Sequence, residues 1–119
     1  MYFDSYKLLN SFVDLYKLNQ SETTYKQIDG KLRFQIIEKT SIEIIISIAK
    51  YREENGDMIA DPEFIIKVNL DKKFVEAISY QDQFGFRPVY FTDGTIDIEA
   101  RYEINSYLKS WLTMQLDTQ

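Results

Sequence analysis

The sequence contains no histidine and no cysteine, and its four glycines and two prolines are isolated within 119 residues. Without cysteine there is no disulfide and no thiolate nucleophile. Without histidine there is no imidazole acid–base relay, and the usual zinc and haem ligand sets are missing. The glycines, at positions 30, 56, 85 and 94, form no phosphate-binding loop. Serine and threonine lack the histidine that usually activates a hydroxyl nucleophile. We therefore expect a protein that is not an enzyme and that binds no cofactor.

Long hydrophobic runs are also missing. The longest apolar stretch is Ile44-Ile45-Ile46, extended by Ser47, Ile48 and Ala49, whereas a membrane-spanning helix needs about 20 apolar residues. Residues 1–7 have neither the basic start nor the apolar core of a secretory signal. These features predict a cytoplasmic protein without a membrane segment.

Positive charge is in the minority. Fourteen basic and nineteen acidic side chains give a formal net charge of −5 and a pI near 4.7. The basic residues are scattered, and the nearest approach to a cluster is Lys67, Lys72 and Lys73. Phosphate contacts need clustered lysine and arginine, so direct binding of nucleic acid is disfavoured.

What is present is a chain that is 45% hydrophobic and 15% aromatic, of a length typical of a single domain spanning residues 1–119. Two segments have helical periodicity. The apolar residues of segment 2–18 are Tyr2, Tyr6, Leu8, Leu9, Phe12, Val13, Leu15 and Tyr16. The second segment ends near Leu116. Its apolar residues are Ile98, Ile104, Leu108, Trp111 and Leu112, and Arg101 falls on the same helix face. Asp97 is the expected N-cap of this second helix, Glu99 lies in its first turn, and Trp111 is expected in the core.

Between the helices the hydrophobic period changes to two, which is typical of strands. The expected strands are 25–28, 32–36, 42–49, 64–70, 74–80 and 86–91, with turns at Asp29-Gly30, 39–41, 71–73 and Phe84-Gly85. Pro62 would lead into the fourth strand, and Pro88 suggests that the last strand lies at an edge. Short connections exclude parallel crossovers. The prediction is an α+β fold, an antiparallel β-meander of four to six strands with the N- and C-terminal helices packed on one face.

Segment 52–63 carries five carboxylates in twelve residues and is interpreted as an exposed hairpin loop turning at Asn55-Gly56. Oxygen ligands suit calcium or magnesium, but the spacing fails the EF-hand pattern. A carboxylate metal site is therefore the weakest alternative. A second acidic group, Asp93, Asp97 and Glu99, is explained by a turn and a helix cap.

The aromatic residues point to an interaction surface. Tyr80, Phe84, Phe86 and Tyr90 cluster around the last hairpin with Arg87. Tyrosine, phenylalanine and arginine are enriched at the centres of protein interfaces, and these five residues are the candidate partner contacts. The alternative is that half of the rings pack beneath the helices. The isoleucine run at 42–48 would favour pairing with a second copy if its strand lay at an edge.

Several stretches resemble small uncharacterised bacterial proteins that are classed as domains of unknown function. The similar residues are 56–64, 67–71, 75–81 and the C-terminal Glu103–Leu112, with its Asn105, Tyr107-Leu108 and Trp111-Leu112. One such group is YqiB-like and occurs in enteric bacteria, and a related group occurs on mobile elements and plasmids. The chain differs from them at Asn69 and Leu70, where those proteins often carry histidine and tyrosine. The resemblance implies a bacterial or mobile-element origin and transfers no site residue.

The leading hypothesis is a small non-catalytic protein that acts by binding a protein partner or a second copy of itself. The alternative is an acidic anti-defence or regulatory protein that blocks a nucleic-acid-binding partner by imitating the charge of phosphates. Salt separates the two, because charge mimicry weakens steeply with ionic strength and an apolar contact does not.

Overall fold

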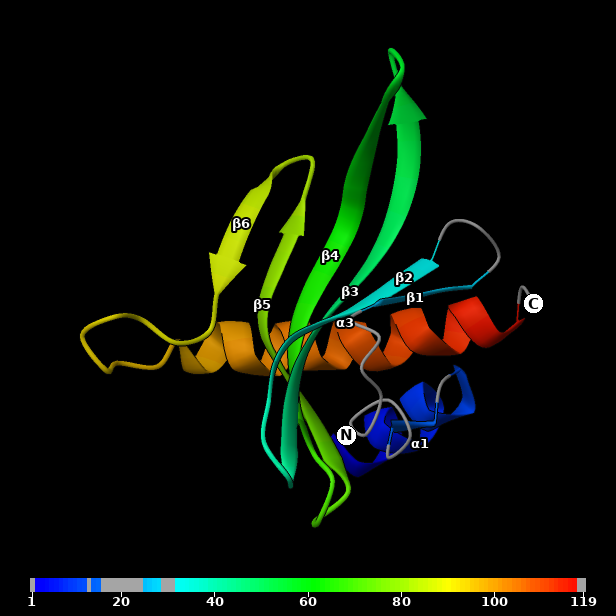
Figure 1. Cartoon of the computed structure of the whole chain (residues 1–119). Helices are drawn as coiled ribbons and strands as arrows, with labels where there is room; N and C mark the ends of the chain where they lie inside the picture. Colours follow the sequence, from blue (N-terminus) through cyan, green and yellow to red (C-terminus); the bar gives the residue numbers. More distant parts are fainter. Residues whose placement is uncertain (1, 13, 16–24, 29–31, 118–119) are drawn as a thin grey trace.

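In the computed structural model the described residues are 2–12, 14–15, 25–28 and 32–117. They form two helices and six strands (Figure 1). The helices are α1 (Tyr2–Phe12) and α3 (Ile98–Asp117), and the strands are β1 (Tyr25–Ile28), β2 (Leu32–Lys39), β3 (Glu43–Glu54), β4 (Asp57–Asn69), β5 (Phe74–Asp82) and β6 (Gly85–Pro88). Val13 and Tyr16 of the expected first helix, and the expected turn at Asp29-Gly30, lie outside these residues.

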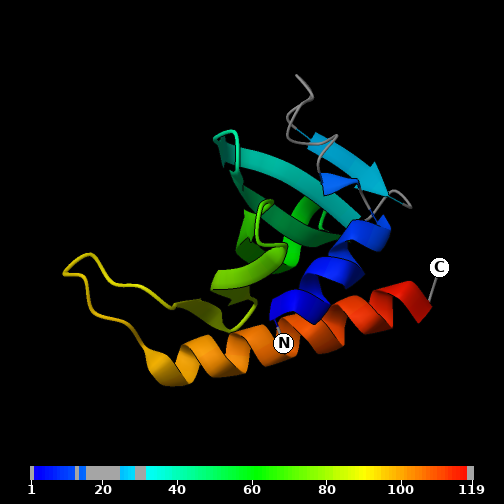
Figure 2. The same cartoon turned by 90° about the horizontal axis from the view of Figure 1, so that it is seen from below.

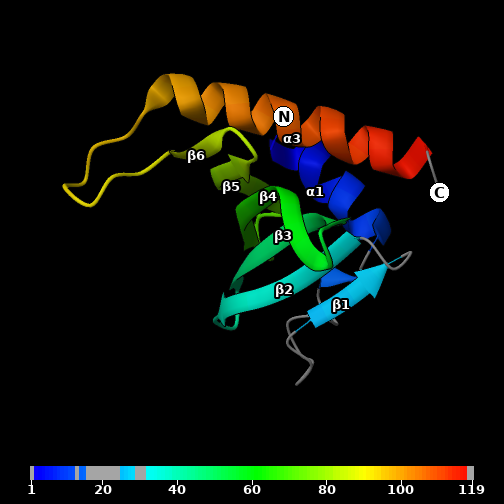
Figure 3. The ribbon, with the colours of Figure 1, turned by 90° about the horizontal axis from the view of Figure 1, so that it is seen from above.

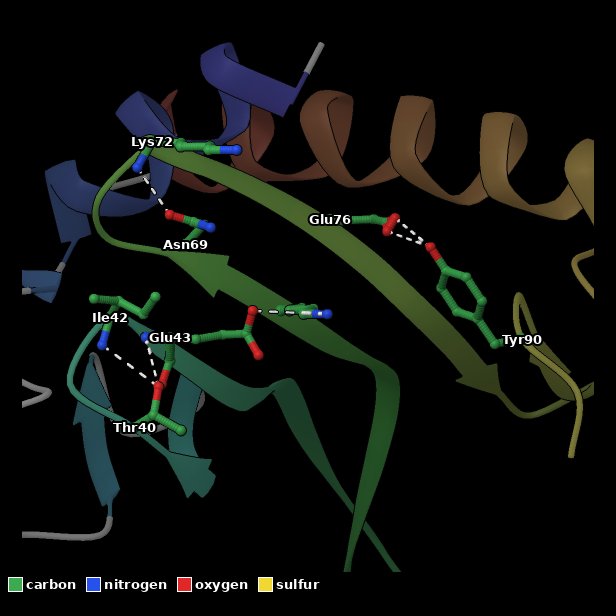
Figure 4. Close-up of polar contacts among 8 residues, drawn as sticks. Thr40, Ile42, Glu43, Asn69, Lys72, Glu76 and Tyr90 are labelled. Carbon is green, nitrogen blue, oxygen red and sulfur yellow. Dashed lines mark hydrogen bonds and ion pairs between the residues drawn. The ribbon is translucent and has the colours of Figure 1, made fainter. Parts of the chain in front are cut away.

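The strands form one antiparallel sheet in chain order, β1-β2-β3-β4-β5-β6. Each strand pairs with the one that follows it in the chain, which is the predicted meander. At the β2–β3 turn the Thr40 hydroxyl accepts hydrogen bonds from the backbone N–H groups of Ile42 and Glu43 (Figure 4). At the β4–β5 turn the Asn69 side chain accepts one from the N–H of Lys72 at 2.8 Å. Both side chains satisfy backbone donors that the sheet leaves unpaired.

Both helices lie on the same side of the sheet (Figures 2 and 3). The core combines Tyr6, Leu9 and Leu15 of the N-terminal region with the alternating apolar residues of β2 to β5 and one stripe of α3. Phe34, Ile46 and Phe64 are fully buried in it, and Trp111 is 3% exposed. The predicted α+β fold, with its helices on one face, is confirmed, and so is the core position of Trp111.

The acidic segment 52–63 is not a loop, and in this the prediction was wrong. β3 and β4 continue through it as paired strands and turn only at Asn55-Gly56, where φ is 54° and 85°. Asparagine and glycine tolerate these positive values, so the turn itself was predicted correctly. Pro62 does not begin β4 but lies within it. It lies beside a register shift in the pairing of β3 with β4, where the hydrogen-bond ladder is interrupted, so the missing backbone N–H of proline costs no ladder bond.

Three further predictions need correction. The last strand ends at Pro88 rather than Phe91, although β6 is at the sheet edge as Pro88 indicated. Ile98 is 77% exposed, and Ala100 takes the buried position in the first turn of α3. The isoleucine strand β3 lies between β2 and β4, so its backbone is already paired and cannot recruit a second copy at an edge.

Among the described residues no helix is long and apolar enough to cross a membrane.

Candidate functional site

A groove of about 490 Å³ opens between the β5–β6 hairpin and the N-terminal half of α3. We call it the aromatic groove. Its lining residues are Tyr80, Asp82, Phe84, Gly85, Phe86, Arg87, Glu103, Ile104 and Tyr107. Four of the five residues that the sequence singled out therefore line one surface, and helix α3 supplies the opposite wall.

The hairpin presents its aromatic rings because of how its turn closes. The Asp82 carboxylate accepts a hydrogen bond from the backbone N–H of Phe84 at 2.8 Å, the pattern of an Asx turn. Gly85 follows with φ of 149°, in a region that other residues rarely adopt. Phe84 is consequently held at the tip with 87% of its surface exposed, and Phe86 of the adjoining strand is 62% exposed.

The floor of the groove continues into the core. The Tyr80 ring lies 5.5 Å from the Tyr107 ring and 5.0 Å from the buried Phe64 ring, between centroids. Its hydroxyl donates to the Asp82 carboxylate at 3.0 Å. Burial and this hydrogen bond raise the pKa of Tyr80 well above its usual value, so the phenol stays protonated at neutral pH. Packed aromatic neighbours hold this ring in place.

The rim of the groove is formed by an ion pair between Arg87 of β6 and Glu103 of α3. The guanidinium lowers the pKa of the Glu103 carboxyl, first by its hydrogen bond and then by its charge. Both side chains are about half exposed, so the pair adds little to stability and mainly sets the orientation of the hairpin against the helix.

Tyr90, the fifth candidate, has a different environment and is not part of the groove lining. Its hydroxyl donates to both oxygens of Glu76, at 2.5 and 2.7 Å (Figure 4). The Glu76 residue is 7% exposed, and its carboxylate also pairs with Arg101 of α3 at 3.3 Å. Burial, followed by the bond to Glu76, raises the pKa of Tyr90 to about 12. This arrangement suits a structural contact better than a partner contact.

Sequence reasoning missed the helix wall of the groove and the buried carboxylate. Glu103 and Tyr107 are four positions apart on α3, so they share one face, but nothing in their order places that face beside the last hairpin. Glu76 was the one carboxylate in the otherwise apolar stretch Phe74–Ile78, and a carboxylate in such a place is usually assigned to solvent. In the folded chain its carboxylate contacts Tyr90 and Arg101 of α3.

The acidic clusters have local explanations. In the 52–63 segment Arg52 pairs with Glu54 and with Asp61 across the hairpin. Asp93 accepts from the N–H and hydroxyl of Thr95, and Asp97 accepts from the N–H of Ala100, which makes it the predicted N-cap of α3. In the part of the chain that the structure describes, no three acidic side chains come together as metal ligands would.

The fold and groove define a class of protein: a small antiparallel sheet backed by two helices, with an aromatic groove where its edge hairpin meets the longer helix. Within that class the chain belongs to the family DUF6908, a domain of unknown function, which matches residues 12–119. No curated protein and no solved structure matches the chain.

Proposed function

We propose that this protein acts by binding another protein through the aromatic groove, without catalysing a reaction. The observation that carries the proposal is the exposure of Phe84 and Phe86 on a turn-locked edge hairpin beside a groove of about 490 Å³. Water contact with such rings is unfavourable, and covering them gains roughly 25 cal/mol for each Å² of apolar surface removed from water. Clustered exposed rings beside an arginine are typical of the centre of an interface.

The absence of catalysis is part of the proposal, and the chemistry of the groove supports it. Its carboxylates have local partners: Asp82 accepts from the Tyr80 hydroxyl and the turn N–H, and Glu103 pairs with Arg87. The pKa of Glu103 is lowered, and that of Tyr80 is raised, so neither is tuned to exchange a proton near neutral pH. The lining includes no nucleophile with an activating base.

The proposal extends to the setting in which the protein works. The resemblance of residues 56–64 and 103–112 to YqiB-like and mobile-element proteins supports a bacterial origin. We extend the proposal to the cytoplasm, since a chain without cysteine needs no oxidising compartment. A partner inside the same cell is therefore the first to look for.

The test is capture of partners by the tagged full chain from a lysate of its own source cells, washed at low and at high salt and read by mass spectrometry. Phe84→Ser removes the most exposed ring of the groove, and Met58→Ser is the matched control, since Met58 is 59% exposed at the far tip of the β3–β4 hairpin. We expect a partner that survives high salt with the unaltered chain and Met58→Ser and is lost with Phe84→Ser.

Three outcomes would contradict the proposal. A partner retained by Phe84→Ser binds elsewhere. Partners that are all lost at high salt, and are themselves nucleic-acid-binding proteins, would favour charge mimicry. A chain that captures no other partner and self-associates in sedimentation, with the association lost in Phe84→Ser, would show that the groove serves a homodimer.

A further inference from the structure

The aromatic rings in the walls of the groove favour a cationic ligand as well as an apolar one. Four of the lining residues are aromatic: Tyr80, Phe84, Phe86 and Tyr107. The face of an aromatic ring carries partial negative charge, which attracts an ammonium or guanidinium group placed over it. Rings from a hairpin and from a helix that converge on one space are an arrangement typical of cation recognition.

The charged residues around the groove have the same preference. Asp82 and Glu103 are part of the lining, against the single cation Arg87, which Glu103 already neutralises. Asp97 and Glu99, in the first turn region of α3, lie close enough to act on the charge of Arg87. Acidic side chains in and beside the groove therefore outnumber its one guanidinium, and the local field repels anions and attracts cations.

The Asp82 carboxylate retains binding capacity. Its two oxygens accept from the Tyr80 hydroxyl and the Phe84 N–H, whereas an ionised carboxylate offers about four lone-pair sites. A guanidinium or ammonium group entering over the Tyr80 and Phe84 rings would therefore meet a fixed acceptor.

Resting on the proposed function, we infer that the aromatic groove takes a cationic side chain, arginine or lysine, from a basic segment of the partner protein. The rings surround the charged group and its aliphatic stem, and Asp82 and the acidic rim supply the complementary charge. The formal net charge of −5 of the whole chain steers such a basic segment toward it.

The test uses Nα-acetylargininamide as the probe and Nα-acetylcitrullinamide, whose side chain has the same shape without the charge, as its neutral analogue; the two are called argininamide and citrullinamide below. Each is titrated into the ¹⁵N-labelled full chain, and backbone amide shifts are followed. We expect argininamide to cause saturable shifts in residues 82–87 and at Tyr107, and citrullinamide to cause weaker ones, with an affinity at least about fivefold lower for loss of the cation–π and charge contributions.

Two variants locate the effect. Phe84→Leu keeps an apolar side chain but removes the ring, and Asp82→Asn keeps an acceptor for the turn N–H but removes the charge. Each is expected to weaken argininamide binding about two- to fivefold. Asp57→Asn, at the exposed tip of the β3–β4 hairpin, is the matched control and should leave the affinity unchanged.

The inference is overturned if citrullinamide binds as well as argininamide, if Phe84→Leu binds argininamide normally, or if argininamide produces no saturable shift at the groove. If partner capture still depends on Phe84 in any of those cases, the proposed function stands and only the cationic occupant is wrong. If argininamide binds as expected but capture is independent of Phe84, the proposed function fails and the groove is a cation-binding site of another kind.

Discussion

At the scale of single residues, the carboxylate of Glu76 is a buried charge held by two neighbours. It is nearly excluded from water, and removing a charge from water is unfavourable unless partners compensate for it. Tyr90 donates one hydroxyl to both of its oxygens, and Arg101 supplies the opposite charge. These contacts join β5 to the segment that follows β6 and to α3.

Replacing Tyr90 by phenylalanine removes that hydroxyl and leaves the ring. We expect the free energy of unfolding to fall by about 1–2 kcal/mol, because the hydrogen bond is made to a charged, buried acceptor that no longer has its donor. Urea unfolding measures the change. Tyr102→Phe, on the exposed side of α3, is the control and should stay within about 0.5 kcal/mol of the unaltered protein.

The difference between the unaltered protein and Tyr90→Phe should depend on pH. The pKa of Tyr90 is about 12 in the folded chain and near 10 when unfolded. A raised pKa stabilises the fold below pH 10, and that contribution disappears as pH rises through 12. The stability difference between the two proteins should therefore be constant from about pH 7 to about pH 10 and shrink between 10 and 12. A difference that grows in that window would refute the assignment.

At the scale of elements, α3 is attached to the sheet through Asn105. β6 pairs only with residues 79–82, so the preceding edge of β5 has no neighbouring strand among the described residues. The Asn105 amide takes that place: its oxygen accepts from the N–H of Ala77 at 2.6 Å, and its nitrogen donates to the Ala77 carbonyl at 3.1 Å. The side chain thus pairs with the strand as another backbone would.

Asn105→Ala should therefore destabilise the protein by about 2–4 kcal/mol, since a buried N–H and a buried carbonyl both lose their partner. Chemical unfolding monitored by circular dichroism gives the value. Met114→Ala, a truncation on the exposed side of the same helix, keeps the helix propensity and should change stability little. If both variants lowered the free energy of unfolding by the same amount, the hydrogen bonds of Asn105 to Ala77 would not contribute to stability.

The β3–β4 hairpin shows why one element was misjudged. Its outer part extends beyond the helices (Figure 1), so few of its side chains are buried and the apolar alternation that signals a strand fades after Ala49. Cross-strand pairing between Arg52 and Asp61 and the tight turn at Asn55-Gly56 hold the strands together instead. Because these contacts join two strands, they produce no alternation of apolar and polar residues along either strand.

At the scale of the whole molecule, residues of α1, β2 to β5 and α3 contribute to one core cluster. The single tryptophan, Trp111, packs in it with its ring 5.3 Å from that of Phe64, so it reports on contact between α3 and the sheet. Since no part of this core can separate without exposing the rest, we expect one cooperative unfolding transition.

Trp111 fluorescence and far-ultraviolet circular dichroism should therefore give the same urea midpoint and the same slope. A fluorescence change that comes first would show that α3 detaches while the sheet persists. Two separate transitions by circular dichroism would contradict a single domain over residues 1–119.

The sequence by itself determined the order of the helices and strands. Alternating apolar residues in segments 32–36 and 64–70, short turns and a capped helix after Asp97 suffice for an antiparallel meander with helices at its ends, because these signals act between near neighbours. It also placed Tyr80, Phe84, Phe86 and Arg87 together, since one hairpin carries them all. Only the tertiary structure decided that Glu103 and Tyr107 face that hairpin, that Asn105 completes the edge of β5, and that Tyr90 serves the buried Glu76. These contacts join residues 14 to 28 positions apart, and such pairings depend on how α3 packs against the sheet, which no local pattern specifies.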